Sequence, residues 1–220
     1  MIKKCSEKDN FSYLLASLIF LLFSSSCLDQ FMPGQGGNLI IIATIISMMI
    51  GVWSVRSTRY AFNTGIGLVI TAIFVTGLIE LLEFAQIDFI LPLVMLGFFS
   101  ITLKMAAEQA LFSGQVTGNS IMGSICIFLL LGLIWAVLFL LLIEFIPTSF
   151  SGIEYTGWKE NLPDFVYFSF VTLTTLGFGD LLPVAPLARF LVYIEAIVGV
   201  FYMAIVVSSL VGARMSGSKN

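Results

Sequence analysis

Histidine is absent from this 220-residue sequence, charged residues are few, and only three cysteines occur. Histidine is both the commonest protein metal ligand and a frequent general base, so its absence disfavours many metal sites and enzymes. Cys5, Cys27 and Cys126 are widely spaced and predict neither a disulfide framework nor a zinc site. A net charge of −3 gives no basic surface for nucleic acid. We therefore expect no enzyme, no cofactor and no nucleic-acid partner.

Charged residues make up only 10% of the chain, whereas soluble domains carry about a quarter. With 59% hydrophobic residues and a mean hydropathy of +1.06, the sequence indicates an all-α integral membrane protein. A helix needs roughly 20 apolar residues to cross a bilayer. Six segments predict transmembrane helices: 11–27, 38–55, 61–82, 87–101, 121–146 and 187–212. The fourth can continue toward residue 111.

The first segment also resembles a cleaved signal peptide, because Lys3 and Lys4 precede an apolar run that ends at Cys27. Ser24 is a poor lipobox residue at its position, so we expect the helix to be retained. Cleavage would leave five spans.

Lysine and arginine are distributed unevenly between the two sides of the six-helix arrangement. Eight fall on one side: Lys3, Lys4, Lys8, Arg56, Arg59, Lys104, Arg214 and Lys219. Only Lys159 and Arg189 fall on the other. Because cytoplasmic loops carry the excess of positive charge, both termini are predicted to be cytoplasmic. The compact chain suggests a multi-pass protein of a bacterial inner cell membrane.

Between the fifth and sixth segments lies a 12-residue apolar stretch, 163–174, which is too short to span a bilayer. Asn161 suits an N-cap and Pro163 suits a first helical turn. Asp164 would face the positive end of the helix dipole. The stretch therefore predicts a re-entrant half-helix.

The half-helix is followed by TLGFGD, residues 175–180. Gly177 and Gly179 stand at alternate positions and allow φ values that other residues avoid. Carbonyl groups that would otherwise alternate can then face one axis, and Thr175 can add a hydroxyl. Four such strands form stacked rings of oxygens that replace the water shell of an ion. Because one chain supplies one strand, this interpretation requires a homotetramer.

The order of outer helix, half-helix, TLGFGD and inner helix, over about residues 121–215, resembles the pore of the tetrameric potassium channel superfamily. The resemblance implies a passive, potassium-selective pore in a lipid bilayer, with K⁺ as the permeant ion. Leu176 and Phe178 replace the Val and Tyr that are commoner in the family, so a weakly selective cation channel remains an alternative. A secondary transporter is a third reading, although the sequence has one interrupted segment and no internal repeat.

The same resemblance assigns roles to individual residues. The K⁺ ligands it implies are backbone carbonyls of Thr175, Leu176, Gly177 and Phe178, with the Thr175 hydroxyl, and Gly179 completes the filter. Thr174 and Asp180 are predicted to support the filter. In the inner helix, the resemblance makes Gly199 a hinge and turns Val200, Met203 and Val207 toward the cavity. Gly199 could instead serve close helix packing.

Glu195 is unusual because a carboxylate inside a membrane span costs about 2.5–3.5 kcal/mol on insertion scales and needs a partner. We predict that Glu195 supports the filter by bonding a filter backbone N–H or a half-helix side chain such as Thr172 or Tyr167. The alternative is a protonated Glu195 turned toward a neighbouring subunit.

Two domains are expected. Residues 1–118 form a four-helix membrane domain resembling a voltage sensor, and residues 119–220 form the pore domain. A voltage sensor needs a ladder of cations along its fourth helix. The fourth segment, extended to residue 111, holds only Lys104, so voltage dependence is expected to be weak or absent.

Overall fold

The computed structural model describes residues 10–31, 36–54, 59–82, 89–111, 118–208 and 212. Most of these residues are helical, and each predicted apolar segment is occupied by a helix. The helices are α1 (Asn10–Phe31), α2 (Gly36–Ser54), α3 (Arg59–Leu82), α4 (Ile90–Leu111), α5 (Gly118–Phe145), α6 (Trp158–Leu173) and α7 (Pro186–Phe201). A π-helix, η2 (Tyr202–Val207), continues α7. The fourth helix does run on to Leu111, as the sequence allowed.

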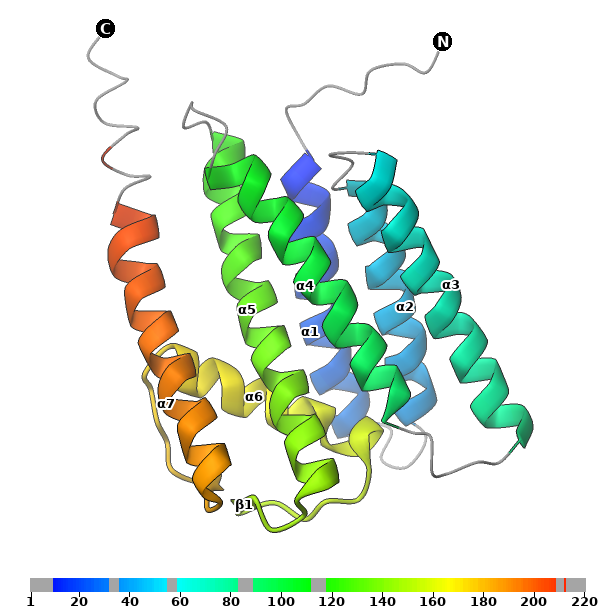
Figure 1. Ribbon diagram of the computed structural model, residues 1–220, viewed down its shortest axis with the longest axis vertical. Helices are drawn as coiled ribbons and strands as arrows, with labels where there is room; N and C mark the ends of the chain where they lie inside the picture. Colours follow the sequence, from blue (N-terminus) through cyan, green and yellow to red (C-terminus); the bar gives the residue numbers. More distant parts are fainter. Residues whose placement is uncertain are drawn as a thin grey trace, which may run out of the picture.

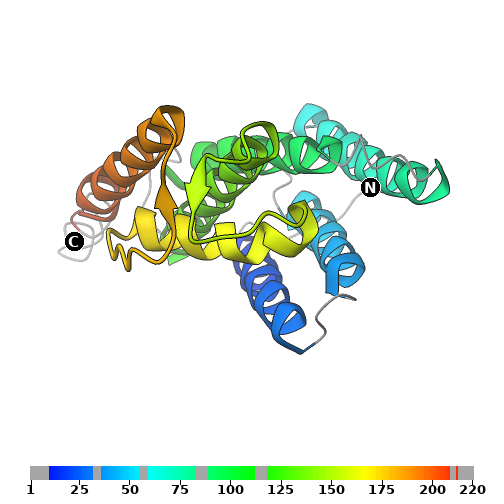
Figure 2. The ribbon, with the colours of Figure 1, turned by 90° about the horizontal axis from the view of Figure 1, so that it is seen from below.

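The long helices α1 to α5 and α7 lie side by side, and α6 crosses them near one end of the bundle (Figure 1). Seen from that end, α6 reaches from α7 toward α1 and α2 (Figure 2). The short helix therefore contacts both the C-terminal and the N-terminal helices, and its position is set by both.

Within the described ranges, four helices are long and apolar enough to cross a membrane. Their apolar windows are Phe11–Leu28, Ile90–Ala110, Gly118–Phe145 and Pro186–Ile205. The apolar stretches of α2 and α3, Leu39–Gly51 and Gly65–Gly77, are shorter. The chain is thus a mostly helical, multi-pass membrane protein.

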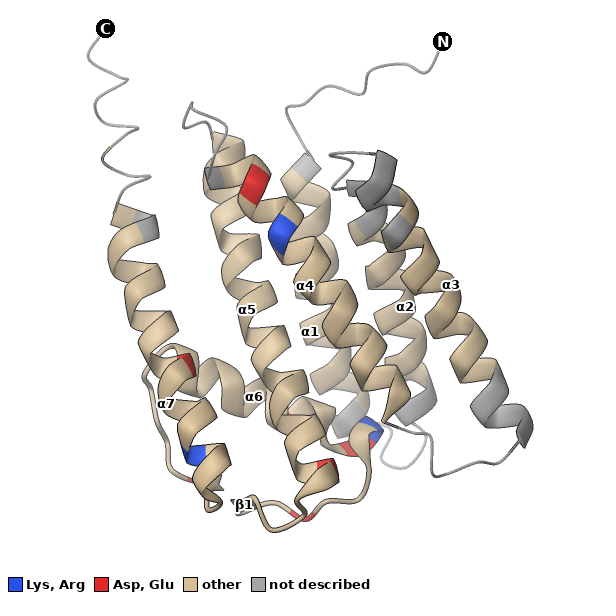
Figure 3. Cartoon of the chain, in the orientation of Figure 1, with Lys and Arg blue, Asp and Glu red and all other residues tan. Residues whose placement is uncertain are grey.

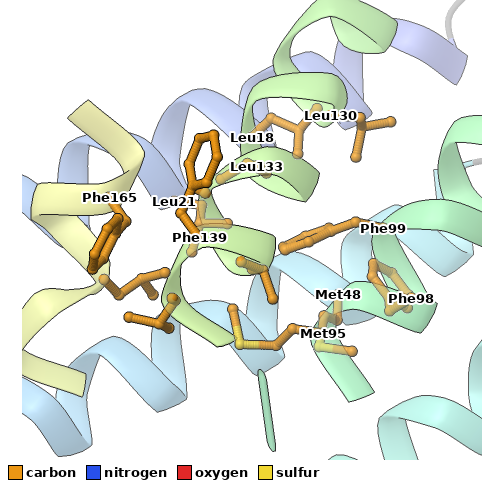
Figure 4. Close-up of a cluster of buried hydrophobic side chains, with 14 of the residues drawn as sticks. Leu18, Leu21, Met48, Met95, Phe98, Phe99, Leu130, Leu133, Phe139 and Phe165 are labelled. Atoms are coloured by element: carbon orange, nitrogen blue, oxygen red, sulfur yellow. The ribbon is translucent and has the colours of Figure 1, made fainter. Parts of the chain in front are cut away.

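A single cluster of buried apolar side chains runs through the bundle (Figure 4). It draws Leu18 from α1, Met48 from α2, Phe99 from α4, Phe139 from α5 and Phe165 from α6. These side chains are 3% exposed or less, so α6 is packed into the same core as the helices around it. That packing holds the middle of α6 against the bundle.

A two-residue antiparallel ladder joins the segments on either side of α6 and its following loop. β1 (Phe150–Ser151) pairs with β2 (Leu182–Pro183), with Phe150 opposite Pro183. Gly152 has φ +89°, and a Cβ there would lie 2.1 Å from the carbonyl oxygen of Asp180. This close approach fixes where the loop after α6 returns to the bundle.

Charged residues of the described part gather toward the ends of the helices (Figure 3). Inside α7 the sequence places one acidic residue, Glu195. Most of the Lys and Arg residues on which the predicted orientation depends lie outside the described residues: Lys3, Lys4, Lys8, Arg56, Arg214 and Lys219. The cytoplasmic placement of the termini therefore stays a prediction.

The start of α6 differs from the prediction. The helix begins at Trp158 after an N-cap at Gly157, so Pro163 lies inside it rather than in its first turn. Asn161 is buried within the helix, and its side-chain oxygen accepts hydrogen bonds from the N–H groups of Thr156 and Gly157. Sequence reasoning missed this because an N-cap side chain accepts hydrogen bonds from N–H groups that follow it. Asn161 instead lies inside the helix and accepts them from N–H groups that precede it.

Candidate ion-conducting site

The loop after α6 begins with a turn that ends the helix. The Thr175 N–H donates to the Thr172 carbonyl (2.9 Å), and the Leu176 N–H donates to the Val171 carbonyl (2.8 Å). This pair of bonds is the Schellman pattern of a helix C-terminus. Thr174 is the C-cap, and its hydroxyl donates to the Phe170 carbonyl at 2.6 Å. Thr174 therefore helps to close α6, and its support of a filter stays a prediction.

Thr175 occupies the position of that turn where glycine is the usual residue. Its φ is +59°, the one positive φ of a non-glycine residue in the described part of the chain. For a β-branched residue this conformation is an outlier and costs roughly 1–2 kcal/mol. Strain of this kind concentrates at functional sites. The hydroxyl of Thr175 is thus placed in the loop at an energetic cost.

Positive φ recurs at every second residue: +59° at Thr175, +59° at Gly177 and +79° at Gly179. Leu176 and Phe178, between them, do not have positive φ. Because the sign of φ alternates along the loop, successive peptide planes are rotated and neighbouring carbonyl groups can face the same side. Sequence reasoning anticipated the two glycines but not the left-handed threonine.

The carbonyl oxygens of residues 174–179 accept no hydrogen bond from any described residue. All of residues 174–180 are exposed in the single chain. Backbone carbonyls are obligatory acceptors, so a row of unbonded ones needs water, a partner or a cation. Such oxygens are the ligands that selectivity filters use for dehydrated cations.

Asp180 is held by the short helix. The Tyr167 hydroxyl donates to one carboxylate oxygen (2.8 Å), and the Leu181 N–H donates to the other (3.1 Å). The hydrogen bond from Tyr167 lowers the pKa of Asp180 below its ordinary value. The ring of Tyr167 also stacks on Phe178, with centroids 6.3 Å apart and planes at 8°. Tyr167, considered above as a partner for Glu195, is therefore the partner of Asp180.

Glu195 lies on α7 where that helix packs against α6, and its side chain is 0% exposed. Its Oε1 lies 2.5 Å from the Ser169 hydroxyl on α6, within hydrogen-bond distance. The half-helix thus provides the partner, but through Ser169 rather than Thr172, Tyr167 or a filter N–H. Sequence reasoning overlooked Ser169; the signal was a small polar residue in an otherwise apolar stretch of α6.

Gly199 packs directly against the end of α6. A Cβ at this position would lie 2.0 Å from the carbonyl oxygen of Leu173, so a larger residue cannot fit without separating α7 from α6. The backbone departs from α-helical geometry only three residues later, where η2 begins at Tyr202. Close packing accounts for the glycine here, and the hinge remains a prediction.

The residues predicted to face the cavity fall on α7 and η2. Val200 and Met203 are each 53% exposed in the single chain. The side chain of Val207 lies outside the described residues. Tyr202, which the sequence did not single out, is buried, and its hydroxyl donates to the Ser124 carbonyl on α5 at 2.5 Å. A buried tyrosine needs such a partner, and that requirement was the available signal.

Comparison with known proteins supports the assignment of this region. Residues 124–213 match a protein family described as an ion channel. No curated protein and no solved structure matches the chain. The matched segment contains most of α5 and all of α6, the alternating loop, α7 and η2. Over this segment, the chain is similar to ion channels.

Proposed function

We propose that this protein is a potassium-selective channel in which four copies of the chain surround one pore. The observation that carries the proposal is the backbone of residues 175–179. Its φ is positive at every second residue, and its carbonyl oxygens accept no hydrogen bond within the described chain. Four such strands around an axis would stack rings of oxygens for a dehydrated cation. The proposed K⁺ ligands are the carbonyls of residues 175–178 and the Thr175 hydroxyl. K⁺ passes through without a cofactor, and the protein is not an enzyme.

The exposed residues on one side of the single chain support a tetramer. The loop 174–180 is exposed, and α7 with η2 presents an exposed apolar face. This face comprises Tyr193, Ile197, Val200, Phe201, Met203 and Ile205. Large exposed apolar patches mark contacts with proteins or membrane. In the proposed tetramer this face lines the cavity and contacts neighbouring copies.

We further propose six membrane crossings with α6 as a re-entrant helix between the fifth and sixth. With 19 residues, α2 is roughly 28 Å long, close to the hydrocarbon thickness of about 30 Å. The longer α3 has 24 residues and can tilt. Both termini would then lie in the cytoplasm of a bacterial cell.

The first four helices are proposed to brace the pore rather than to sense voltage. α4 contains Lys104 as its one cation, so little charge could move through the membrane field. α1 and α4 both pack on α5, and α1 and α2 also contact α6. This region therefore supports the helices on which the pore is built.

The proposal is tested by ion flux from liposomes that contain the purified protein. We expect K⁺ to leave K⁺-loaded liposomes while Na⁺ stays in Na⁺-loaded ones, and Gly177→Ala to stop the K⁺ flux. Equal K⁺ and Na⁺ flux would instead indicate a weakly selective cation channel. Flux that saturates and requires a coupling ion, from a monomer or dimer, would indicate a transporter.

A further inference from the structure

The buried hydroxyl of Ser169 lies between two oxygen acceptors. Its Oγ is 2.7 Å from the carbonyl oxygen of Gly132 on α5 and 2.5 Å from Oε1 of Glu195 on α7. A serine hydroxyl carries one proton, and both a backbone carbonyl and an ionised carboxylate are acceptors only. If Glu195 were ionised, one of these two short contacts would contain no proton.

We propose that Glu195 is a protonated carboxylic acid and that it donates to Ser169, which in turn donates to the Gly132 carbonyl. Each contact then contains one proton, and both distances fall in the ordinary range for O–H···O bonds. The resulting relay joins α7, α6 and α5 in one chain of hydrogen bonds.

The surroundings of Glu195 favour the neutral form. Its side chain is fully buried, and Oε2 has no hydrogen-bond partner among the described residues. An unpaired buried charge is costly, especially in a membrane span. Arg189 lies six residues earlier, and its Nε donates to the Pro183 carbonyl instead.

No titratable group among the described residues forms a hydrogen bond with Glu195. On α5, Cys126 contacts the Phe11 carbonyl and Glu144 binds Tyr155. On α6, Tyr167 binds Asp180. The hydrogen bond to Ser169 is the one polar contact that the described chain gives the Glu195 side chain.

The relay belongs to a seam that fixes α7 on α6 at two successive turns. Glu195 and Gly199 are four residues apart on α7, and their contacts Ser169 and Leu173 are four apart on α6. Leu173 is the last residue of α6 before the alternating loop. Glu195 and Ser169 are therefore positioning residues for that loop, an inference that rests on the proposed function.

Gly132 allows the contact between α5 and α6 that completes the relay. A Cβ at Gly132 would lie 2.6 Å from the ring of Phe170, so the absence of a side chain lets α6 approach α5. That approach brings the Gly132 carbonyl within reach of Ser169.

Infrared difference spectroscopy of the full chain in lipid at neutral pH tests the protonation state. The spectrum of the wild type minus that of Glu195→Gln should contain the C=O band of a protonated carboxylic acid. Ser169→Ala should shift this band to higher frequency, because the acid loses its acceptor. The exposed Glu154→Gln is the control and should leave the acid band in place. Carboxylate bands alone, or a band that Ser169→Ala does not move, would overturn the relay.

Ion flux tests the positioning role separately. Glu195→Gln keeps a neutral donor of the same shape, so its K⁺ flux should equal that of the wild type. Glu195→Leu removes the donor and should lower the flux about fivefold or more. Equal flux from Glu195→Leu would overturn the positioning role. An acid band in a protein that conducts no K⁺ would support the relay and contradict the proposed function.

Discussion

The N-terminal helices and the C-terminal part of the chain use their buried hydroxyl groups differently. In α1, α2 and α4, the hydroxyls of Ser17, Thr44 and Thr102 donate to carbonyls one turn earlier in their own helix. In the C-terminal part, the hydroxyls of Ser169 and Tyr202 contact other helices, at sequence separations of 37 and 78 residues.

Local bonds satisfy a hydroxyl without fixing a neighbouring helix, whereas long-range bonds set the distance between helices. The division is not complete, since Ser47 on α2 donates to the Ser17 carbonyl on α1, and Ser124 on α5 donates to the Ile121 carbonyl of its own helix. The contrast nevertheless indicates that the relative positions of α5, α6 and α7 are specified more tightly, next to the loop that we propose conducts K⁺.

The largest expected effect comes from Gly177→Ala. Its φ of +59° costs a side-chain-bearing residue roughly 1–2 kcal/mol, and four chains would multiply that cost. We expect K⁺ flux to be lost. Gly97→Ala on α4 is the matched control, because Gly97 is helical with open space around it. The control should conduct normally and gain about 0.5–1 kcal/mol of stability. Normal flux from Gly177→Ala would contradict the alternating backbone.

Gly199→Ala should have the next largest effect, because its Cβ would lie 2.0 Å from the Leu173 carbonyl oxygen. Overpacking of this kind costs typically about 1–3 kcal/mol and should move α7 away from α6. We expect a lower melting temperature of the assembly and at least partial loss of flux. Gly212→Ala, with nothing within 4 Å, serves as the control. If both variants behaved alike, the close contact would be without consequence.

Thr175 allows stability and function to be separated. Thr175→Gly relieves the strained φ and should stabilise the folded chain by roughly 1 kcal/mol. It also removes the hydroxyl, so K⁺ selectivity over Na⁺ should fall. Thr175→Ser keeps the hydroxyl and should retain more selectivity. Thermal unfolding and flux ratios measure the two effects, and a destabilised, fully selective Thr175→Gly would oppose this account.

Tyr202→Phe and Thr44→Val compare a hydrogen bond between two helices with one inside a single helix. Removing the bond from Tyr202 to the Ser124 carbonyl should destabilise the protein by about 1 kcal/mol. Thr44→Val removes a bond within one helix turn and should change stability by roughly half as much or less. Denaturation in the same detergent compares the two. Equal losses would remove the distinction between the two parts of the chain.

The smallest effect concerns pH. The hydrogen bond from Tyr167 lowers the pKa of Asp180. The stability that this bond gives the folded state is therefore present above the ordinary pKa and is lost as pH falls through the lowered value. Tyr167→Phe should raise the pKa of Asp180 toward its ordinary 3.8. Conductance measured during acidification should then decline at a higher pH than in the wild type. Identical acid profiles would show that the bond does not influence the pore.

The sequence predicted the positions of the helices well, because each apolar segment is separated from the next by glycine, proline or charged residues. It also placed the turn at TLGFGD through two glycines at alternate positions. The contacts of Glu195 could not be predicted in the same way. They depend on the angle at which α6 crosses α7 (Figure 1), and this angle follows from the close approaches at Gly132 and Gly199.

The start of α6 was misjudged for a related reason. Asn161 has the preferred chemistry of an N-cap, but the tertiary structure uses its side chain to bond the backbone of Thr156 and Gly157 from within the helix. Local propensity alone does not distinguish these two uses of one amide.

The central claim is that the alternating backbone of residues 175–179 selects K⁺. It is tested most directly by the reversal potential of purified protein in a planar bilayer, with K⁺ on one side and Na⁺ on the other. The account predicts a reversal near the K⁺ equilibrium potential that disappears in Gly177→Ala. A clear current that reverses near zero would contradict it.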